Sequence, residues 1–216
     1  MKENLTELVF ILDKSGSMSG LEEDTIGGFN SMLEKQRNEV GEACVTTVLF
    51  DNNYELLHDR LDIKSIQPMT RNEYYVGGST ALLDAVGTAI NNVGKSLAAT
   101  REENRPSKVM FVIITDGMEN SSCEYNHKKI KEMIEHQKSK YAWDFIFLGA
   151  NIDAVKTASS FGINKDRAVN FISDSQGTEL NYKVLSEAVS CYRQGKTVNK
   201  DWKKEIEKDF KRRGKR

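Results

Sequence analysis

The sequence predicts an α/β fold in which a doubly wound, mostly parallel central sheet carries helices on both faces. Short apolar runs alternate along the chain with segments of helical periodicity, as in repeated β-α units. Residues 109–115 are apolar at nearly every position, which is typical of a strand buried on both faces of a parallel sheet. The 216 residues, 38% of them hydrophobic, suffice for one large core.

The strands are predicted from runs with the length and the β-branched or aromatic content of buried strands. We expect a sheet of about six strands, at residues 8–12, 45–50, 54–61, 109–115, 145–148 and 168–172. Only the turn Phe50-Asp-Asn-Asn-Tyr54 separates the second run from the third. That turn is too short for the crossover between parallel strands, so the third run is predicted to be one antiparallel edge strand.

Helices are predicted where apolar residues recur on one helical face. Four segments show this spacing, with inner faces formed by Ile26, Phe29, Leu33 and Val40; by Leu82, Val86, Ala89, Ile90, Val93 and Leu97; by Ile130, Met133 and Ile134; and by Leu180, Val184, Leu185, Ala188 and Val189.

The last residues differ in composition from the rest, so we divide the chain into a domain at 1–198 and a C-terminal basic amphipathic helix or tail at 199–216. Trp202, Ile206 and Phe210 recur every four residues and form an apolar stripe. Residues 211–216 form a basic end, which we expect to be a solvated tip. A contact with nucleic acid or an acidic partner is the less favoured interpretation, because the segment is short.

The overall composition limits the cellular compartments and the classes of partner that we expect for this protein. The net charge of −1 gives no global attraction to nucleic acid or to an anionic membrane. No stretch approaches the roughly 20 apolar residues of a membrane-spanning helix, and no secretory leader is evident. The three cysteines have no paired spacing, which argues against a disulfide framework or a zinc site. We therefore expect a cytoplasmic protein, with leaderless export left open.

Three loops at the ends of predicted strands or the start of a helix carry candidate metal ligands. They are residues 13–20, with Asp13, Ser15 and Ser17; residues 77–82, with Thr80; and residues 116–122, with Asp116. In doubly wound sheets ligands bind outside the carboxyl ends of the strands, where such loops meet. All the candidate donors are hard oxygens, which suit Mg²⁺, Mn²⁺ or Ca²⁺. Two carboxylates and three hydroxyls leave at least one coordination position open to an external ligand.

This pattern resembles the metal-ion-dependent adhesion site (MIDAS) of von Willebrand factor A-type (vWA) domains. The matching residues are Asp13-x-Ser15-x-Ser17, Thr80 and Asp116-Gly117, and the resemblance covers about residues 5–195. It implies that the two serines and the threonine contact the metal, and that the two aspartates act directly or through water. It also implies that a partner protein supplies a Glu or Asp to the metal.

Two further stretches narrow the resemblance. Residues 115–122, Thr-Asp-Gly-Met-Glu-Asn-Ser-Ser, and residues 147–154, Phe-Leu-Gly-Ala-Asn-Ile-Asp-Ala, are similar to small stand-alone bacterial vWA proteins. Tellurium-resistance-associated proteins are a looser match. A divalent-metal-dependent adhesion or adaptor module is therefore the expected function.

Each candidate also has a purely structural interpretation. Ser17 or Ser19 could cap the following helix, and Thr80 could cap the helix that starts at residue 81. The role of Asp116 could be limited to forming an Asp-Gly turn with Gly117. We expect residues 119–122 to be solvated loop, Lys14 to be a surface lysine, and the three histidines to lie at the surface. We favour metal binding for Ser15, Ser17, Thr80 and Asp116.

The sequence segments that resemble enzymatic motifs each lack a required residue, so no catalytic activity is expected. Gly94-Lys95-Ser96 and Gly195-Lys196-Thr197 resemble the end of a phosphate-binding loop, but Ala89 and Ser190 occupy its first glycine position. Met18 occupies the nucleophile position of Gly16-Ser-Met-Ser-Gly20. The alternative functions are a metal-dependent hydrolase, a scaffold subunit of a nucleotide-driven complex, or a nucleic-acid adaptor acting through the basic tail.

Overall fold

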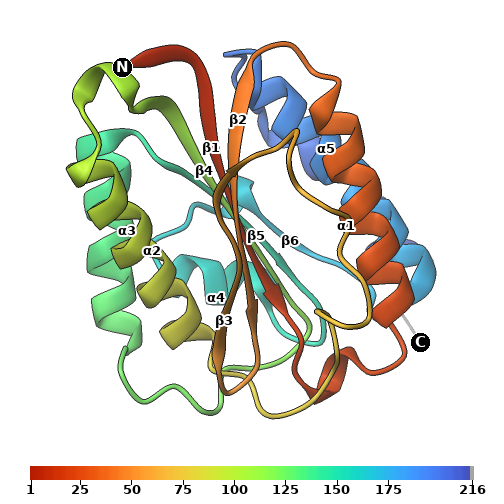
Figure 1. Cartoon of the computed structure of the whole chain (residues 1–216). Coiled ribbons are helices and arrows are strands. Elements are labelled where there is room, and N and C mark those ends of the chain that lie inside the picture. Colours follow the sequence, from red (N-terminus) through yellow and green to blue (C-terminus); the bar gives the residue numbers. More distant parts are fainter. Residues whose placement is uncertain (215–216) are drawn as a thin grey trace.

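A computed structural model describes residues 1–214, and it shows one six-stranded sheet between two layers of helices (Figure 1). The strands are β1 (Lys2–Asp13), β2 (Glu42–Phe50), β3 (Tyr54–Asp62), β4 (Pro106–Thr115), β5 (Asp144–Gly149) and β6 (Ala168–Asn170), in the spatial order β3-β2-β1-β4-β5-β6. Only β3 is antiparallel to its neighbour. The predicted doubly wound, mostly parallel sheet with one antiparallel edge strand is confirmed.

The helices cover both faces of the sheet. They are α1 (Glu22–Arg37), α2 (Leu82–Ala99), α3 (His127–Tyr141), α4 (Ala154–Ser160), α5 (Ser175–Arg193) and α6 (Lys204–Arg213). Helices α1, α5 and α6 contribute to one hydrophobic core, and α2, α3 and α4 contribute to the other (Figure 1). Among residues 1–214, no helix is both long and apolar enough to cross a bilayer.

Alternate residues of β1 show why an uninterrupted apolar run was needed. Leu8 and Phe10 pack into the core under α1 and α5, whereas Val9 and Ile11 pack into the core under α2 and α3. All four side chains are fully buried. Because successive side chains of a strand point to opposite faces, the segment of β1 that lies between two helical layers is apolar at successive positions.

Three predicted details are wrong or incomplete. Helix α1 ends at Arg37, so Val40 lies beyond it and is 85% exposed instead of buried on its inner face. Strand β6 ends at Asn170, two residues earlier than predicted. Helix α4 is absent from the prediction, because its seven residues give too few turns to show a periodic apolar face.

The predicted C-terminal helix docks on the body of the fold. After a 3₁₀ turn at Lys200–Lys203, α6 buries Ile206 against the core shared by α1 and α5. The indole Nε1 of Trp202 donates a hydrogen bond of 2.8 Å to the Asp166 carbonyl. The basic tip is not wholly solvated as predicted, because Arg213 pairs with Asp174 and Asp209. Lys215 and Arg216 of that tip lie outside the described residues.

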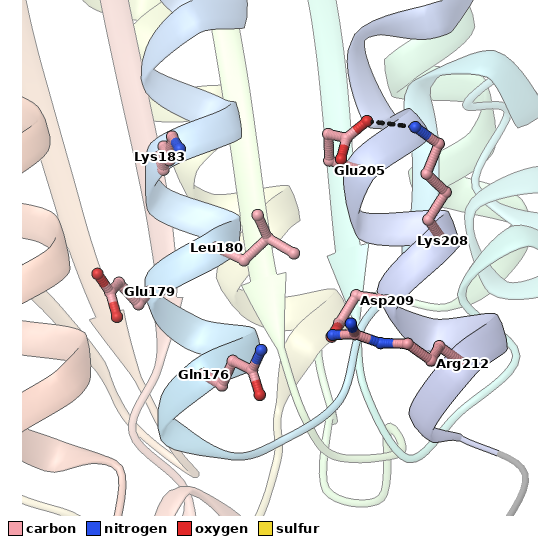
Figure 2. Close-up of a pocket in the computed structure, with 8 residues that line it drawn as sticks. All are labelled: Gln176, Glu179, Leu180, Lys183, Glu205, Lys208, Asp209 and Arg212. Atoms are coloured by element: carbon pink, nitrogen blue, oxygen red, sulfur yellow. Dashed lines mark hydrogen bonds and ion pairs between the residues drawn. The ribbon is translucent and has the colours of Figure 1, made fainter.

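A polar groove of about 560 Å³ separates α5 from α6 (Figure 2). Leu180 points from α5 into the gap, and charged side chains of both signs surround it. Lys208 and Glu205 form an ion pair of 2.7 Å on the α6 side. The charges of this groove therefore largely compensate one another.

Candidate metal centre

The candidate site lies at the carboxyl ends of the two central strands, β1 and β4. These strands are parallel neighbours, and Leu12 is in register with Ile114, so Asp13 and Asp116 follow adjacent strand ends. From this pair the chain continues outward in opposite directions, through β2 on one side and β5 on the other. That divergence is the switch in strand order where doubly wound sheets bind ligands.

The Asp13 carboxylate is buried and held by hydrogen bonds from two elements. Its Oδ1 accepts a 2.7 Å bond from the Ser15 amide, and its Oδ2 accepts a 2.5 Å bond from Thr115 Oγ1 at the end of β4. Burial raises the pKa of the Asp13 carboxyl, although the bonds to Ser15 and Thr115 oppose the rise. An ionised carboxylate with so little solvent favours a cation as its neighbour.

A tyrosine fixes the backbone beneath this carboxylate. The Tyr74 hydroxyl donates a 2.6 Å bond to the Asp13 carbonyl, and the Tyr74 side chain is 1% exposed. Burial raises the pKa of Tyr74 well above its usual value, so its hydroxyl remains a donor. The first loop is thus anchored on its inner side as well as at the strand end.

The two predicted serines lie together and face Asp116. Ser15 Oγ and Ser17 Oγ are 3.1 Å apart, and Ser17 Oγ donates a hydrogen bond to Asp116 Oδ1. The other carboxylate oxygen, Oδ2, accepts a 2.9 Å bond from Ser173 Oγ. Both Asp116 oxygens therefore already contact hydroxyl groups.

Sequence reasoning missed Ser173, which lies in the loop between β6 and α5. Like Ser15 and Ser17, it is a hydroxyl residue shortly after a strand end, three residues after Asn170. That position was the one available signal, and the prediction contained it, because Ser173 directly follows the strand expected at residues 168–172.

Thr80 reaches the same point from the second loop. Its amide donates a 2.9 Å bond to Asn120 Oδ1, and its carbonyl accepts a 3.1 Å bond from the Asn120 amide. A Cβ built on Gly117 would lie 2.8 Å from Thr80 Oγ1 and 3.2 Å from Ser17 Oγ. Hydroxyls from the first and second loops therefore flank one backbone position of the third, and the structure brings all five predicted residues to one place.

Backbone hydrogen bonds hold the first loop to the second. The Gly16 amide donates to the Gly78 carbonyl at 3.1 Å, and the Gly77 amide donates to the Lys14 carbonyl at 2.9 Å. Gly78 has a φ of +72°, a conformation that favours glycine. The Ser15 and Thr80 segments are therefore positioned by main-chain contacts and not by their side chains alone.

The capping interpretations of the serines and the threonine are not realised. Helices α1 and α2 begin after Leu21 and Ala81, and neither of these N-cap residues makes a side-chain capping bond. Thr80 therefore does not cap α2.

The third loop is more structured than the predicted solvated loop. Glu119 Oε2 accepts a 2.9 Å bond from the Leu83 amide, and Ser122 Oγ accepts a 3.0 Å bond from the Asp84 amide. These contacts tie the loop to the first turn of α2.

Lys14 is not the surface lysine that was predicted, because only 2% of it is exposed. Its Nζ forms a 2.8 Å ion pair with Glu55 and lies 3.8 Å from the centre of the Tyr75 ring. Burial alone would lower the pKa of Lys14, but its hydrogen bonds to Glu55 and Tyr75 raise it, so the amine stays charged. The Lys14 side chain extends from the first loop towards Glu55 of β3.

One of the three histidines also departs from the prediction. His58 is 8% exposed and its Nδ1 lies 2.9 Å from Thr47 Oγ1, so it is a buried residue of β3. His127 and His136 are exposed, as predicted.

The donor set fits a hard divalent cation. Across residues 1–214, no group of three or more His, Cys, Asp or Glu side chains could hold a metal by itself. Two carboxylates and neighbouring hydroxyls meet at the strand ends instead. Oxygen donors of this kind suit Mg²⁺, Mn²⁺ or Ca²⁺ better than a softer ion.

Comparisons with known proteins agree with this fold. No family model matches the sequence, and no curated protein matches it. A solved von Willebrand factor type A structure from Catenulispora acidiphila matches with a TM-score of 0.55, 13% identity, 87% of this chain and 43% of its own. Proximal thread matrix protein 1 from the mussel byssus matches with a TM-score of 0.57, 13% identity, 87% of this chain and 47% of its own.

Another structure of the mussel protein, described as having a zinc-occupied MIDAS motif, gives a TM-score of 0.59 at 14% identity, covering 87% of this chain and 46% of its own. The chain thus spans less than half the length of these structures. The fold of this protein is the vWA fold, and in a neighbour of that fold the MIDAS motif holds a divalent metal.

Proposed function

We propose that this chain is a divalent-cation-dependent protein-binding module with no catalytic activity of its own. The cation, Mg²⁺ with Mn²⁺ or Ca²⁺ as substitutes, would be held by Asp13, Ser15, Ser17, Thr80 and Asp116. Bound there, it would offer an open coordination position to a Glu or Asp carboxylate of a partner protein. One observation carries the proposal: hydroxyls from two loops and a carboxylate from a third meet around Gly117.

The proposed ligands are of two kinds, charged carboxylates and neutral hydroxyls, and each kind would have its own role. Asp13 and Asp116 supply the negative charge that retains a cation, and both are oriented by hydroxyl donors. Ser15, Ser17 and Thr80 supply neutral oxygens, so the site does not accumulate enough negative charge to repel an incoming carboxylate. This balance favours binding of an acidic partner.

The titratable groups of the site support binding rather than turnover. Its two carboxylates accept hydrogen bonds from Thr115, Ser17 and Ser173, and the histidines lie on β3 and α3. A hydrolase would need a general base oriented towards a metal-bound water. Magnesium-dependent hydrolysis of phosphate or ester substrates by the pure protein, abolished by Asp116→Ala, would contradict this part of the proposal.

The metal-binding part is tested by titrating Mn²⁺ into the folded protein and following its electron paramagnetic resonance signal. Asp116→Asn and Ser17→Ala should weaken binding strongly. Ser19→Ala removes an exposed serine of the same loop and is the matched control, so its affinity should stay at the wild-type level. Unchanged affinity in folded Asp116→Asn would refute the site.

The partner-binding part is tested with a phage-displayed peptide library selected on the immobilised chain in Mg²⁺ and eluted with chelator. The eluted peptides should be enriched in Glu or Asp, and Thr80→Ala should lower their retention. Enrichment of peptides without a carboxylate, or retention that ignores the chelator, would refute recognition through the cation.

A further inference from the structure

A groove near the amino ends of the parallel strands, at the opposite end of the sheet from the candidate metal site, has properties that this site does not explain. Its volume is about 730 Å³, and it lies between the C-terminal halves of α2 and α3, beside the start of β4. Small-molecule sites in proteins typically have volumes of about 300–1,000 Å³. The groove between α5 and α6 shown in Figure 2 is smaller and lined by charges of both signs.

The floor of this α2–α3 groove is aromatic and apolar. Trp143 lines it and is 6% exposed, and its ring stacks on Phe111 with centroids 5.3 Å apart and planes 16° apart. Ile90 and Val109 extend the same lining. The indole is thus fixed from below by the core, with its remaining exposed surface at the groove.

A glycine in the middle of α2 keeps the groove open. Gly94 lines it, and a Cβ at this position would lie 4.0 Å from Trp143 Cη2, an ordinary contact. Close packing therefore does not require glycine here, although glycine costs a helix about 1 kcal/mol relative to alanine. Gly87, two turns earlier in α2, differs because a Cβ there would fall 2.5 Å from the Tyr125 ring.

The charged side chains of the rim are all basic. Lys95, Arg105 and Lys140 line the groove, and none of its described lining residues is Asp or Glu. Arg105 donates hydrogen bonds to the carbonyls of Thr100 and Ala98 at the C-terminal end of α2, at 2.8 and 3.1 Å. Within the described part of the chain, Lys95 and Lys140 form no ion pair.

We propose that this groove binds a small amphipathic anion, with a planar apolar body against Trp143 and a carboxylate, sulfonate or phosphate near Lys95 and Lys140. The lysines select the charge, because an anion there meets two cations and no carboxylate. Gly94 and the fixed indole provide the depth for an apolar body. This site is independent of the candidate metal site and lies at the opposite ends of the strands.

The test uses two dyes that differ by one charge: 8-anilinonaphthalene-1-sulfonate and its uncharged analogue N-phenyl-1-naphthylamine. The protein carries Trp202→Phe, which leaves Trp143 as the single indole of a chain with two tryptophans. Chelator keeps the metal site out of the measurement. The sulfonate should quench Trp143 emission along a saturable isotherm and bind more tightly than the neutral dye. Dye emission with wild-type protein should give the same isotherm.

Variants separate the floor of the groove from its rim. Lys95→Ala and Lys140→Ala should each weaken sulfonate binding about 2- to 5-fold, the strength of an exposed ion pair, and leave the neutral dye unaffected. Lys128→Ala, on α3 but outside the groove, is the charge control. Gly94→Leu should abolish binding of both dyes, whereas Gly94→Ala should retain it. Both substitutions improve helix propensity, so the variants should fold.

Three results would overturn the proposal. Sulfonate binding that survives Gly94→Leu would place the dye elsewhere. Equal, lysine-insensitive binding of both dyes would reduce the groove to an apolar patch without charge selection. Sedimentation that shows a wild-type dimer and a Gly94→Leu monomer would assign the groove to a second copy of the chain.

Discussion

Gly117→Ala is a sensitive test of how the candidate metal site is built, because the change adds one methyl group between two proposed ligands. The new Cβ would lie 2.8 Å from Thr80 Oγ1 and 3.2 Å from Ser17 Oγ. A separation below 3.0 Å requires a shift, and Thr80 is held by Asn120 through its backbone. The hydroxyl must therefore turn away from the site.

The magnitude follows from losing one oxygen ligand while keeping the fold. A hydrogen bond or similar contact to a charged group contributes about 1.5–3 kcal/mol, so Mn²⁺ affinity should fall about 10- to 150-fold. Stability in urea should stay within about 1 kcal/mol of wild type, because Gly117 is not among the positive-φ glycines and alanine restricts the unfolded chain slightly.

The control is Gly77→Ala, a substitution in the neighbouring loop where a Cβ would meet nothing within 4 Å. Mn²⁺ binding is measured by electron paramagnetic resonance, and unfolding by circular dichroism in urea. If folded Gly117→Ala binds Mn²⁺ like wild type, or if Gly77→Ala loses as much affinity, the three loops do not share one cation.

Three further predictions concern the site's support, the C-terminal helix and pH. Ser173→Ala should weaken Mn²⁺ binding several-fold in the same titration, because Asp116 Oδ2 loses its 2.9 Å donor; an unchanged affinity would make Ser173 dispensable. Trp202→Ala should lower the free energy of unfolding by about 2 kcal/mol in urea, and Lys211→Ala by under 0.5 kcal/mol; equal values would make the segment a free tail. Burial lowers the pKa of His58, so the unfolded chain takes up its proton first as pH falls below about 6.5. The free energy of unfolding should then fall by up to about 1.4 kcal/mol per pH unit, and His58→Gln should lack this component in urea titrations from pH 8 to 5.

Elements with a strong local signal could be predicted from the sequence. Residues 8–12 of β1 and 109–114 of β4 are apolar throughout, and the Phe50–Tyr54 turn leaves β3 no path except an antiparallel return. The ends of the helices were harder to predict from the sequence. The apolar pattern continued to Val40, but α1 stops at Arg37 and Gly41 adopts a φ of +93°, which periodicity does not report.

In the candidate site too, residues close together in the sequence could be predicted to meet, and contacts between distant residues could not. Asp13, Ser15 and Ser17 share one short segment, so their convergence could be anticipated from spacing and strand-end position. The partners of Lys14 and Asp116 could not. Lys14 finds Glu55 on β3, 41 residues away, and Ser173 lies 57 residues after Asp116. Only the order of strands in the sheet brings such pairs together.

The scattering of the site along the chain has a thermodynamic consequence. Asp116 and Ser17 are 99 residues apart, yet they share a hydrogen bond, so the unfolded chain contains no comparable site. A cation that binds only the native state adds to the free energy of unfolding by mass action. Each tenfold rise in free Mg²⁺ above the dissociation constant would add about 1.4 kcal/mol. With the proposed site occupied, the melting temperature would report the free magnesium concentration, and chelation would make the protein more susceptible to proteolysis.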